Sequence, residues 1–383
     1  MARAVRPLFW TSTLLLAWTQ ALYGPALALL RRLRARRRFE PPSRAREPLP
    51  RVSLIVAAYR EQEVIAERVA NALALDWPRE RLEVIVAVDG GAEPGADGTA
   101  EHARAAGADL VLELPRAGKV RTQDAGVRAA SGDLIAFSDA NARWAPDALR
   151  RLAGRFADPS VGYVCGRVDF TSTGGTNQEG LYWRYELWVR EQESALGSVT
   201  AGNGAIYAVR PQAYVEVDPV MGHDLTLPFT LVKRGWRAVY EPSARATEKM
   251  VPSIEGEWAR KRRMMSHAWP IVLRGGLLDP RGYPPLYALM VASHRLLRYV
   301  TPALHVALAL ATVGLVRRGR VYAVAAAVQG GVLAGAAAGG RWRARPALVA
   351  RYYVLTTASL AAGLYDWARH GTPAGWEAAE GTR

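Results

Sequence analysis

The chain has 383 residues, a formal net charge of +15 and one cysteine, Cys165. A single cysteine excludes an internal disulfide, and the surplus of positive charge predicts anionic partners such as lipid headgroups or nucleotide phosphates. The length allows one large domain with additional elements. The apolar residues gather at both ends, outside a middle part (about 50–250) that has the composition of a soluble α/β domain.

The first apolar segment covers residues 8–30 and contains no charged residue. As a helix it is long enough to cross roughly 30 Å of hydrocarbon. A signal peptide would have a shorter apolar core and a cleavage site, so we expect a membrane span. It is followed at once by Arg31, Arg32, Arg34, Arg36, Arg37 and Arg38. These outnumber Arg3 and Arg6 before the segment, and the positive-inside rule therefore predicts an outside N-terminus and a cytoplasmic middle domain.

Short apolar runs alternate with amphipathic segments in the middle domain. Strands are expected at Val52–Ala58, 82–88 and 108–114 and in a run that ends at Asp139, with helices near 64–73, 99–106 and 119–130 between them. This alternation predicts a parallel sheet with right-handed crossovers. Ligands bind beyond the carboxyl ends of the strands in such a sheet, so Asp89 and Asp139 are expected to face the binding crevice.

The stretch 132–141 reads Gly-Asp-Leu-Ile-Ala-Phe-Ser-Asp-Ala-Asn. It predicts a buried strand that delivers oxygen ligands at its end, because Asp139 and Asn141 follow the apolar run at alternate positions. Hard oxygen donors suit Mg²⁺ or Mn²⁺ that bridges a diphosphate. Asp and Asn are also common in turns, so the stretch taken alone also fits a plain strand end.

Four elements together carry a resemblance to a known family. They are Val-Ser-Leu-Ile-Val-Ala-Ala-Tyr-Arg-Glu, Val-Asp-Gly, Arg-Ala-Gly-Lys and Ser-Gly-Asp-Leu-Ile-Ala-Phe-Ser-Asp-Ala-Asn. In order and spacing they resemble the nucleotide-binding half of membrane-bound family-2 glycosyltransferases, such as the bacterial enzymes that make polysaccharides or glycolipids. The resemblance implies the GT-A fold, a Rossmann-like mixed α/β sheet flanked by helices, here with transmembrane helices at both ends.

The resemblance also implies roles for individual residues. Asp89 would accept a hydrogen bond from the nucleobase, Asp139 would hold the metal near the ribose, and Lys119 would contact a phosphate. The whole donor-binding set implied is Ala58, Tyr59, Glu61, Asp89, Lys119, Asp139, Asn203, Arg260 and Arg263. The chain departs from the family pattern at Arg60, Asp124, Asn141, His223 and Met264.

Two further segments of the middle domain belong to the resemblance. Residues 201–207, which include Asn203, resemble the family's glycine-rich strand that enters the donor-sugar site, where small residues let a ligand approach the backbone. Asp224 stands near the start of an expected helix, a position where Asp is often only an N-cap. The family has an acidic pair here whose second member is the catalytic base; Asp224 matches that member, and His223 replaces the first.

A basic segment follows at 258–263, Trp-Ala-Arg-Lys-Arg-Arg. As a helix it would lie on acidic headgroups, with nearby tryptophans at the interface. In membrane-bound members of the family a Gln or Arg, two residues, and then Arg and Trp bind the leaving diphosphate. Arg260 and Arg263 have that spacing, and Met264 takes the place of Trp.

Three more apolar segments, at 299–316, 321–340 and about 351–368, predict spans after the middle domain. Four spans would return the C-terminus to the outside. The loop that contains Arg317, Arg318 and Arg320 would then also lie outside, which opposes the positive-inside rule. We therefore expect an N-terminal transmembrane helix with a basic flank (1–38), a cytosolic GT-A domain (39–250), basic amphipathic interfacial helices (251–298) and about three C-terminal transmembrane helices with a tail (299–383).

The resemblance implies an inverting glycosyltransferase that moves a sugar from a nucleotide-sugar donor, UDP-linked, to a saccharide or lipid-linked acceptor. The acceptor hydroxyl has a pKa far above 7 and needs an aligned carboxylate, the role expected of Asp224. Mg²⁺ or Mn²⁺ at Asp139 and Asn141, helped by Arg260 and Arg263, would stabilise the departing diphosphate. We expect a multi-pass protein of the inner membrane with its catalytic domain in the cytoplasm.

Two alternatives stay open. A polyprenyl-phosphate sugar synthase, like the dolichyl-phosphate mannose synthases, would use an acceptor that is already an anion and depend less on a base. A non-catalytic membrane scaffold that retains a nucleotide-binding fold would fit the departures from the family pattern. The expected partners are the donor, the acceptor and membrane lipids; nucleic acid is not among them, because the basic residues cluster beside apolar spans.

Overall fold

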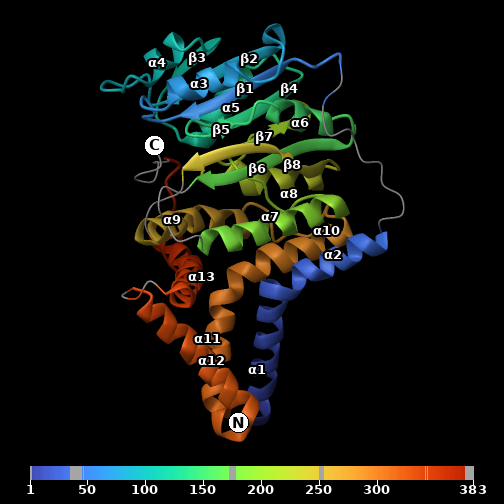
Figure 1. The fold of residues 1–383 in the computed structure, drawn as a ribbon, viewed down its shortest axis with the longest axis vertical. Helices are drawn as coiled ribbons and strands as arrows, with labels where there is room; N and C mark the ends of the chain where they lie inside the picture. Colours follow the sequence, from blue (N-terminus) through green and yellow to red (C-terminus); the bar gives the residue numbers. More distant parts are fainter. Residues whose placement is uncertain are drawn as a thin grey trace.

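A computed structural model describes residues 2–34, 45, 47–171, 178–249, 254–340, 342 and 344–375. Arg36, Arg37 and Arg38, on which part of the orientation argument depends, lie outside these residues. Figure 1 shows the sheet with its helices at one end of the molecule and long helices at the other. A layer of helices lies between the two parts, and this layer joins them.

The expected parallel strands form one half of the sheet. They are β1 (Val52–Ala58), β2 (Leu82–Asp89), β3 (Leu110–Leu114) and β4 (Leu134–Asp139). β1 pairs in parallel with both β2 and β4, and β2 pairs in parallel with β3. β1 lies between β2 and β4, so the ends of these three strands meet at one edge of the sheet.

The second half makes the sheet mixed, as the GT-A resemblance implies. It consists of β5 (Arg143–Trp144), β6 (Val161–Thr171), β7 (Tyr207–Val209) and β8 (Arg237–Lys249). Within the described residues the sheet has eight strands in the order β3-β2-β1-β4-β7-β6-β8-β5. β7 runs antiparallel to β4 and β6. The strand expected over 201–207 is wrong for most of its length: residues 201–206 form a loop that leads into β7.

Helices cover both faces of the sheet. They are α3 (Ile65–Leu73), α4 (Thr99–Ala105), α5 (Lys119–Ala129), α6 (Ala148–Arg155) and α8 (His223–Lys233). Ile55 and Ile135 face the core that includes α8, whereas Leu54 and Ala136 face the core that includes α6. Burial on both faces explains why these strands read as continuous apolar runs rather than as alternating ones.

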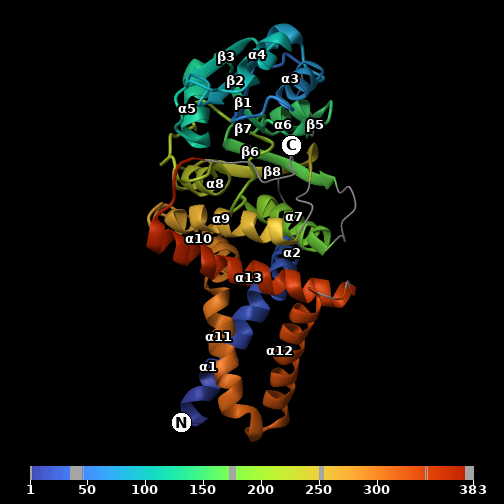
Figure 2. The ribbon, with the colours of Figure 1, turned by 90° about the vertical axis from the view of Figure 1, so that its left-hand side faces the viewer.

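The connecting layer contains α7 (Gln178–Leu196), α9 (Ile254–Leu273), α10 (Pro285–Met290) and α13 (Arg345–His370). Figure 2 shows α9 and α13 side by side beneath α8. α13 runs crosswise to the long helices α1 (Ala2–Ala17), α11 (Leu297–Leu315) and α12 (Arg320–Ala338) and contacts α11 and α12.

Among the residues that the structure describes, four helical segments are long and apolar enough to cross a membrane: Val5–Arg34, Pro285–Arg318, Arg320–Ala338 and Arg345–His370. The first two are each interrupted by a π-helix, η1 (Trp18–Leu22) before α2 (Tyr23–Arg34) and η3 (Val291–Leu296) before α11. Both helices bend there, so that α2 and α10 turn beneath the sheet domain (Figure 1). Thr19 Oγ1 in η1 donates to the carbonyl oxygen of Ser293 in η3 (3.3 Å).

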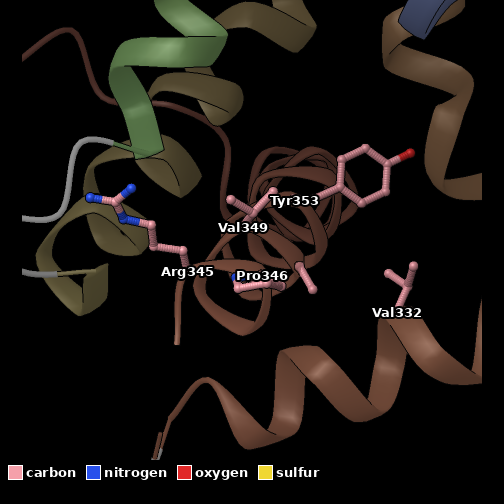
Figure 3. A pocket seen from close by; sticks show the side chains of 6 residues that line it. Val332, Arg345, Pro346, Val349 and Tyr353 are labelled. Carbon is pink, nitrogen blue, oxygen red and sulfur yellow. The ribbon is translucent and has the colours of Figure 1, made fainter. Parts of the chain in front are cut away.

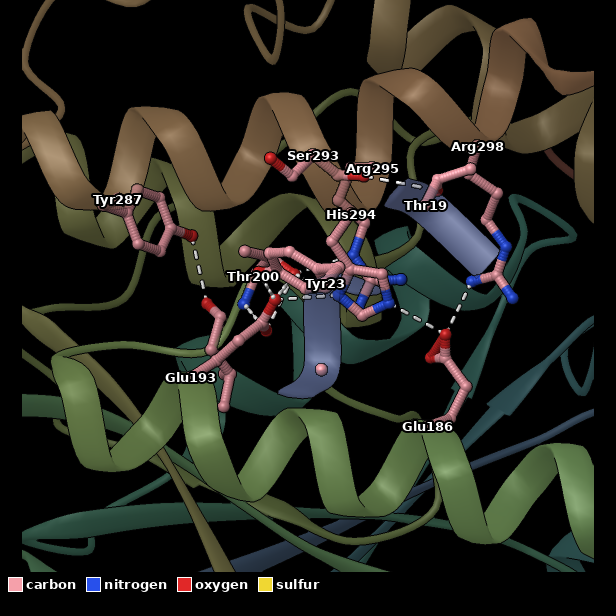
Figure 4. A network of polar contacts seen from close by, with 12 residues as sticks. Thr19, Tyr23, Glu186, Glu193, Thr200, Tyr287, Ser293, His294, Arg295 and Arg298 are labelled. Atoms are coloured by element: carbon pink, nitrogen blue, oxygen red, sulfur yellow. Dashed lines mark hydrogen bonds and ion pairs between the residues drawn. The ribbon is translucent and has the colours of Figure 1, made fainter. Parts of the chain in front are cut away.

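A buried polar network joins α7 to η3 (Figure 4). His294 contacts Glu193 through Nδ1 (2.8 Å) and Glu186 through Nε2 (2.9 Å). Arg298 also donates to Glu186 (2.9 Å), and Tyr23 donates to Glu193 (2.7 Å). Charged groups of helices far apart in the sequence are thereby paired where the sheet domain meets the long helices.

Two apolar grooves lie among the long helices, of about 570 Å³ between α12 and α13 and about 610 Å³ beside η3. The first is lined by Val332, Arg345, Pro346, Val349, Ala350 and Tyr353 (Figure 3). None of the expected donor-binding residues lines either groove. We therefore look for the chemistry at the edge of the sheet.

Candidate active site

The ends of neighbouring strands bring the expected acidic residues to one edge of the sheet. Asp89 is the last residue of β2 and Asp139 the last of β4. Lys119 is the first residue of α5, and its ammonium group is bonded to Asp139. Gly204 lies behind this pair, because a Cβ added there would be 3.2 Å from Nζ of Lys119. The small residue predicted at this loop thus keeps the backbone close to the charged groups.

Three carboxylates act on the charge of the Lys119 ammonium group. Burial opposes its charge, yet Asp139, Asp224 and Glu248 together raise the pKa of Lys119. Asp224 comes from the first turn of α8 and Glu248 from the end of β8, so the cluster combines three separate parts of the fold. Asp139 and Asp224 thus act on the same lysine, and their roles in a donor site stay predictions.

Glu248 is a member of this cluster that the sequence analysis missed. Burial, and next the charge of Asp139, raise the pKa of Glu248 to about 7. Glu248 is the next-to-last residue of β8, which continues to Lys249. A signal was present: Ala244 and Ala246 are buried at alternate positions, and the same alternation places Glu248 on the inner face.

The start of α8 is fixed by the loop before β7. The backbone N–H of Gly202 donates to the carbonyl oxygen of Asp224 (2.7 Å). Asn203 in the same loop has little free hydrogen-bonding capacity, because its Nδ2 donates to the carbonyl oxygen of Gly166 (2.7 Å) and its Oδ1 accepts the N–H of Ile206 (2.9 Å). The side chain expected to bind donor is thus bonded to the protein backbone and shapes the loop beside Asp224.

His223 points into the domain interior and is 4% exposed. Burial, with the charge of Lys119, lowers the pKa of His223 to about 3, so its ring is neutral. Its Nδ1 lies 2.9 Å from the hydroxyl of Tyr207, and its Nε2 lies 3.4 Å from that of Tyr214, which donates to Asp124 (2.6 Å). Each of these contacts has one donor and one acceptor if the hydroxyl of Tyr207 donates to Nδ1 and the N–H at Nε2 donates to the hydroxyl of Tyr214. Two departures from the family pattern, Asp124 and His223, are therefore linked through Tyr214.

Tyr59 and Asp89, the two side chains expected to bind the nucleobase, both contact Arg116. The position that these two side chains would offer to a base is called here the Tyr59–Asp89 slot. The guanidinium carbon of Arg116 lies 3.2 Å from the centroid of the Tyr59 ring, and its Nη1 donates to Asp89 (2.7 Å). Asp89 also accepts the backbone N–H groups of Ala117 (2.7 Å) and Gly118 (3.1 Å). Asp89 thus holds the 116–118 loop that leads to Lys119.

Ala58 and Glu61 lie on either side of Tyr59 in the sequence. Ala58 is the buried last residue of β1. The N–H of Glu61 donates to Oγ1 of Thr99 (2.9 Å), and its carbonyl oxygen accepts the N–H of Ile65 (2.9 Å) at the start of α3. Glu61 therefore fixes the turn beside the slot through its backbone, and its contact with a nucleobase stays a prediction.

The basic helix α9 brings positive charge to the carboxylates. Arg260 is close enough to Glu248 to oppose the rise in its pKa. Burial lowers the pKa of His267, and Arg263 acts in the same direction whereas Asp224 opposes it. Arg260 thus acts on Glu248, and Arg263 acts on His267, the same side chain that Asp224 influences.

Within the described residues, no three Asp, Glu, His or Cys side chains are grouped so that they could hold a metal ion by themselves. A divalent cation held by Asp139 would therefore need further oxygen ligands, such as those of a diphosphate. Oxygen donors of this kind are the preferred ligands of Mg²⁺ and Mn²⁺. Asn141 follows Asp139 by two residues in the turn after β4, so it remains a candidate ligand as well.

Comparisons with known proteins agree with this arrangement. The family model described as "Glycosyltransferase like family 2" matches residues 50–266, more than half of the chain. An N-acetylglucosaminyltransferase of Mesorhizobium japonicum is 28% identical over 243 residues, which cover 58% of this chain and 56% of that protein. The poly-beta-1,6-N-acetyl-D-glucosamine synthase of Staphylococcus aureus is 25% identical over 258 residues, covering 64% and 61%. The match thus spans less than two thirds of these relatives' lengths.

A solved structure shares the fold over nearly the whole chain. It is a mannosyltransferase from Pyrobaculum calidifontis, solved in complex with GDP-Man and Mn²⁺, which covers 97% of this chain and 100% of its own with a TM-score of 0.73. Its sequence is 23% identical, so this likeness bears on the fold. Taken with the family model, it shows that the chain belongs to glycosyltransferase family 2 and has the GT-A fold, with helices that could span a membrane.

Proposed function

We propose that this protein transfers a sugar, with inversion, from a UDP-linked donor to a saccharide or lipid-linked acceptor at the cytoplasmic face of the inner membrane. The observation that carries the proposal is the ion pair of Lys119 with Asp139 at the strand ends, where Asp224 and Glu248 also act on the charge of Lys119. The relatives named N-acetylglucosaminyltransferase and poly-beta-1,6-N-acetyl-D-glucosamine synthase support an N-acetylglucosamine donor.

Each side chain has a task in this reaction. Asp224 accepts the proton of the acceptor hydroxyl as the oxygen attacks the anomeric carbon. Lys119, Arg260 and Arg263 stabilise the negative charge that develops on the departing diphosphate. Tyr59 and Asp89 hold the nucleobase by stacking and hydrogen bonding.

Asp139, Asn141 and Glu248 would hold Mg²⁺ or Mn²⁺. Such an ion supplies Lewis-acid stabilisation of the leaving diphosphate. In the structure the ammonium group of Lys119 is bonded to Asp139, so a bound cation would compete with Lys119 for that carboxylate. Lys119 would then be available to a phosphate oxygen.

The role of Asp224 as catalytic base is tested with the variant Asp224→Asn, purified in detergent. Loss of the carboxylate should reduce sugar transfer by roughly 10²–10⁴-fold, because the amide cannot accept the acceptor proton. Donor binding, measured by titration calorimetry, should stay within about threefold of the parent, since the site retains its other charges. Asp218→Asn, an exposed carboxylate in the segment before α8, is the matched control. Unchanged turnover in Asp224→Asn would remove the assignment.

A donor panel with two acceptor arms tests the substrate proposals. UDP-linked and GDP-linked sugars are offered with oligosaccharides in one arm and with a polyprenyl phosphate in the other, and the released nucleotide is measured. We expect release from a UDP-linked sugar with an acceptor hydroxyl. A product formed only with polyprenyl phosphate, at a rate that Asp224→Asn does not change, would favour the polyprenyl-phosphate synthase instead. If no nucleotide is released from any of the donors in either arm, the non-catalytic scaffold would be favoured.

A further inference from the structure

The end of α13 is fastened to the basic helix α9. Nε1 of Trp269 donates to the carbonyl oxygen of Leu360 (2.8 Å), and Arg262 makes two hydrogen bonds of 2.6 Å to Asp366. After α13 ends, Oγ1 of Thr372 donates to the carbonyl oxygen of Ser266 (2.8 Å). These contacts direct the chain beyond residue 370 away from the long helices and toward the sheet domain.

The residues that follow reach the Tyr59–Asp89 slot. Ala374 lies so close to the 116–118 loop that a Cβ added at Gly118 would collide with its carbonyl oxygen. A Cβ added at Gly375 would lie 3.3 Å from Nη2 of Arg116. In Figure 2 this red segment rises from the end of α13 past α8. We call residues 371–375 the C-terminal strap.

The strap lies behind a side chain that occupies the slot. Carbon atoms in contact are separated by roughly 3.5–4.0 Å, so a base between Tyr59 and Arg116 would need about twice the observed 3.2 Å. The guanidinium group is planar, lies on the Tyr59 ring and donates to Asp89. These are the two contacts that the proposed function gives to the nucleobase. Arg116 and the base therefore exclude each other.

We propose that the C-terminal strap is an autoinhibitory element that keeps Arg116 in the Tyr59–Asp89 slot, so that the donor binds only when Arg116 leaves. The inference rests on the proposed function, which defines the slot. Because the strap continues from α13, a shift of α13 against α9 would change how firmly the slot is closed. Donor affinity would thereby depend on the helices that face the membrane.

The experiment compares nucleotide binding by the full chain and by a variant that ends after Gly371. The dissociation constants of UDP and of GDP are measured by titration calorimetry in detergent with Mn²⁺. If the slot is open in about one molecule in ten, removal of the strap should tighten binding by about tenfold. Arg116→Ala should have the same effect and tests the idea even if the shortened chain folds poorly. The combination should gain nothing further, because both changes open one slot.

The control is Arg369→Ala, which removes one positive charge from the exposed last turn of α13. It should bind nucleotide like the full chain. Equal or weaker binding after removal of the strap, or equal or weaker binding by Arg116→Ala, would overturn the inference while leaving the proposed function in place. Absence of nucleotide binding in every variant would overturn the proposed function, and the inference with it.

Discussion

At the scale of single residues, Asp139 and Asp224 could be predicted and Glu248 and Arg116 could not. Asp139 ends a short apolar run and Asp224 stands in the first turn of a helix, so local pattern and family resemblance both mark them. Glu248 is separated from Asp139 by 109 positions along the chain. Arg116 belongs to the Arg-Ala-Gly-Lys element of the family resemblance, but only folding places it on Tyr59. Local sequence carries no information on such pairings.

Glu248 gives a prediction at this scale. Glu248→Gln removes one of the carboxylates that act on the charge of Lys119, so Mn²⁺ should bind about tenfold more weakly or worse. Binding is measured by electron paramagnetic resonance of free Mn²⁺ with nucleotide absent. Glu101→Gln, on the exposed side of α4, should leave the affinity unchanged. Equal affinities in the two variants would exclude Glu248 as a ligand.

At the scale of elements, helices and parallel strands were predicted closely because their signals are local. The run Val52–Ala58 forms β1 with the same bounds, and the helix expected at 119–130 is α5. The prediction of a strand over 201–206 was wrong, because glycines and Asn203 form a loop there.

The partners of α7 could not be predicted from the sequence. Glu186 and Glu193 share one face of the helix at a spacing of seven, but His294 lies about 100 residues away.

The contact between α7 and η3 should depend on pH. Burial opposes the charge of Glu186, but His294 outweighs it and lowers the pKa from the usual 4.5 to about 2. A carboxyl group whose pKa is lower in the folded state stabilises the fold at any pH above its usual pKa of 4.5. This contribution to the free energy of unfolding disappears as the pH falls from about 4.5 toward 2. The free energy of unfolding should therefore fall by up to roughly 3 kcal/mol over this window. Thermal unfolding in detergent at stepped pH measures the loss.

Two variants on α7 isolate that contribution. Glu186→Gln should be less stable at pH 7, because His294 and Arg298 lose a buried partner, and its stability should change less between pH 5 and 3. Glu191→Gln on the same helix breaks a half-exposed pair with Arg31 and should keep the pH dependence of the parent. An identical pH dependence in Glu186→Gln and the parent would show that another group titrates in this window.

At the scale of the whole molecule, apolar length alone did not determine how the helices are placed. Residues Arg345–His370 satisfy the length and composition of a span, yet α13 runs crosswise to α1, α11 and α12 (Figure 2). The reason is its packing on α9, in which Trp269 and Arg262 bind Leu360 and Asp366. The expectation of four spans puts the C-terminus outside, whereas residues 371–375 contact the sheet domain.

Membrane topology can be tested with introduced cysteines. Arg318→Cys lies between α11 and α12 and Arg369→Cys at the end of α13, both exposed. If α13 does not cross the membrane, an impermeant maleimide should label Arg318→Cys from outside the cell and Arg369→Cys only in inverted vesicles. The parent is the control, because its only cysteine, Cys165, is fully buried. Labelling of both positions from the same side would mean that α13 spans the bilayer.

The paired π-helices η1 and η3 have a consequence for evolution of the chain. A π-turn accommodates one extra residue within an α-helix, so deletion of a residue in either segment would restore regular α-helix there and straighten the bend. The hydrogen bond from Thr19 to Ser293 ties the two corners together. A change in one corner would thus have to be matched in the other, and we expect insertions and deletions here to occur jointly among relatives or not at all.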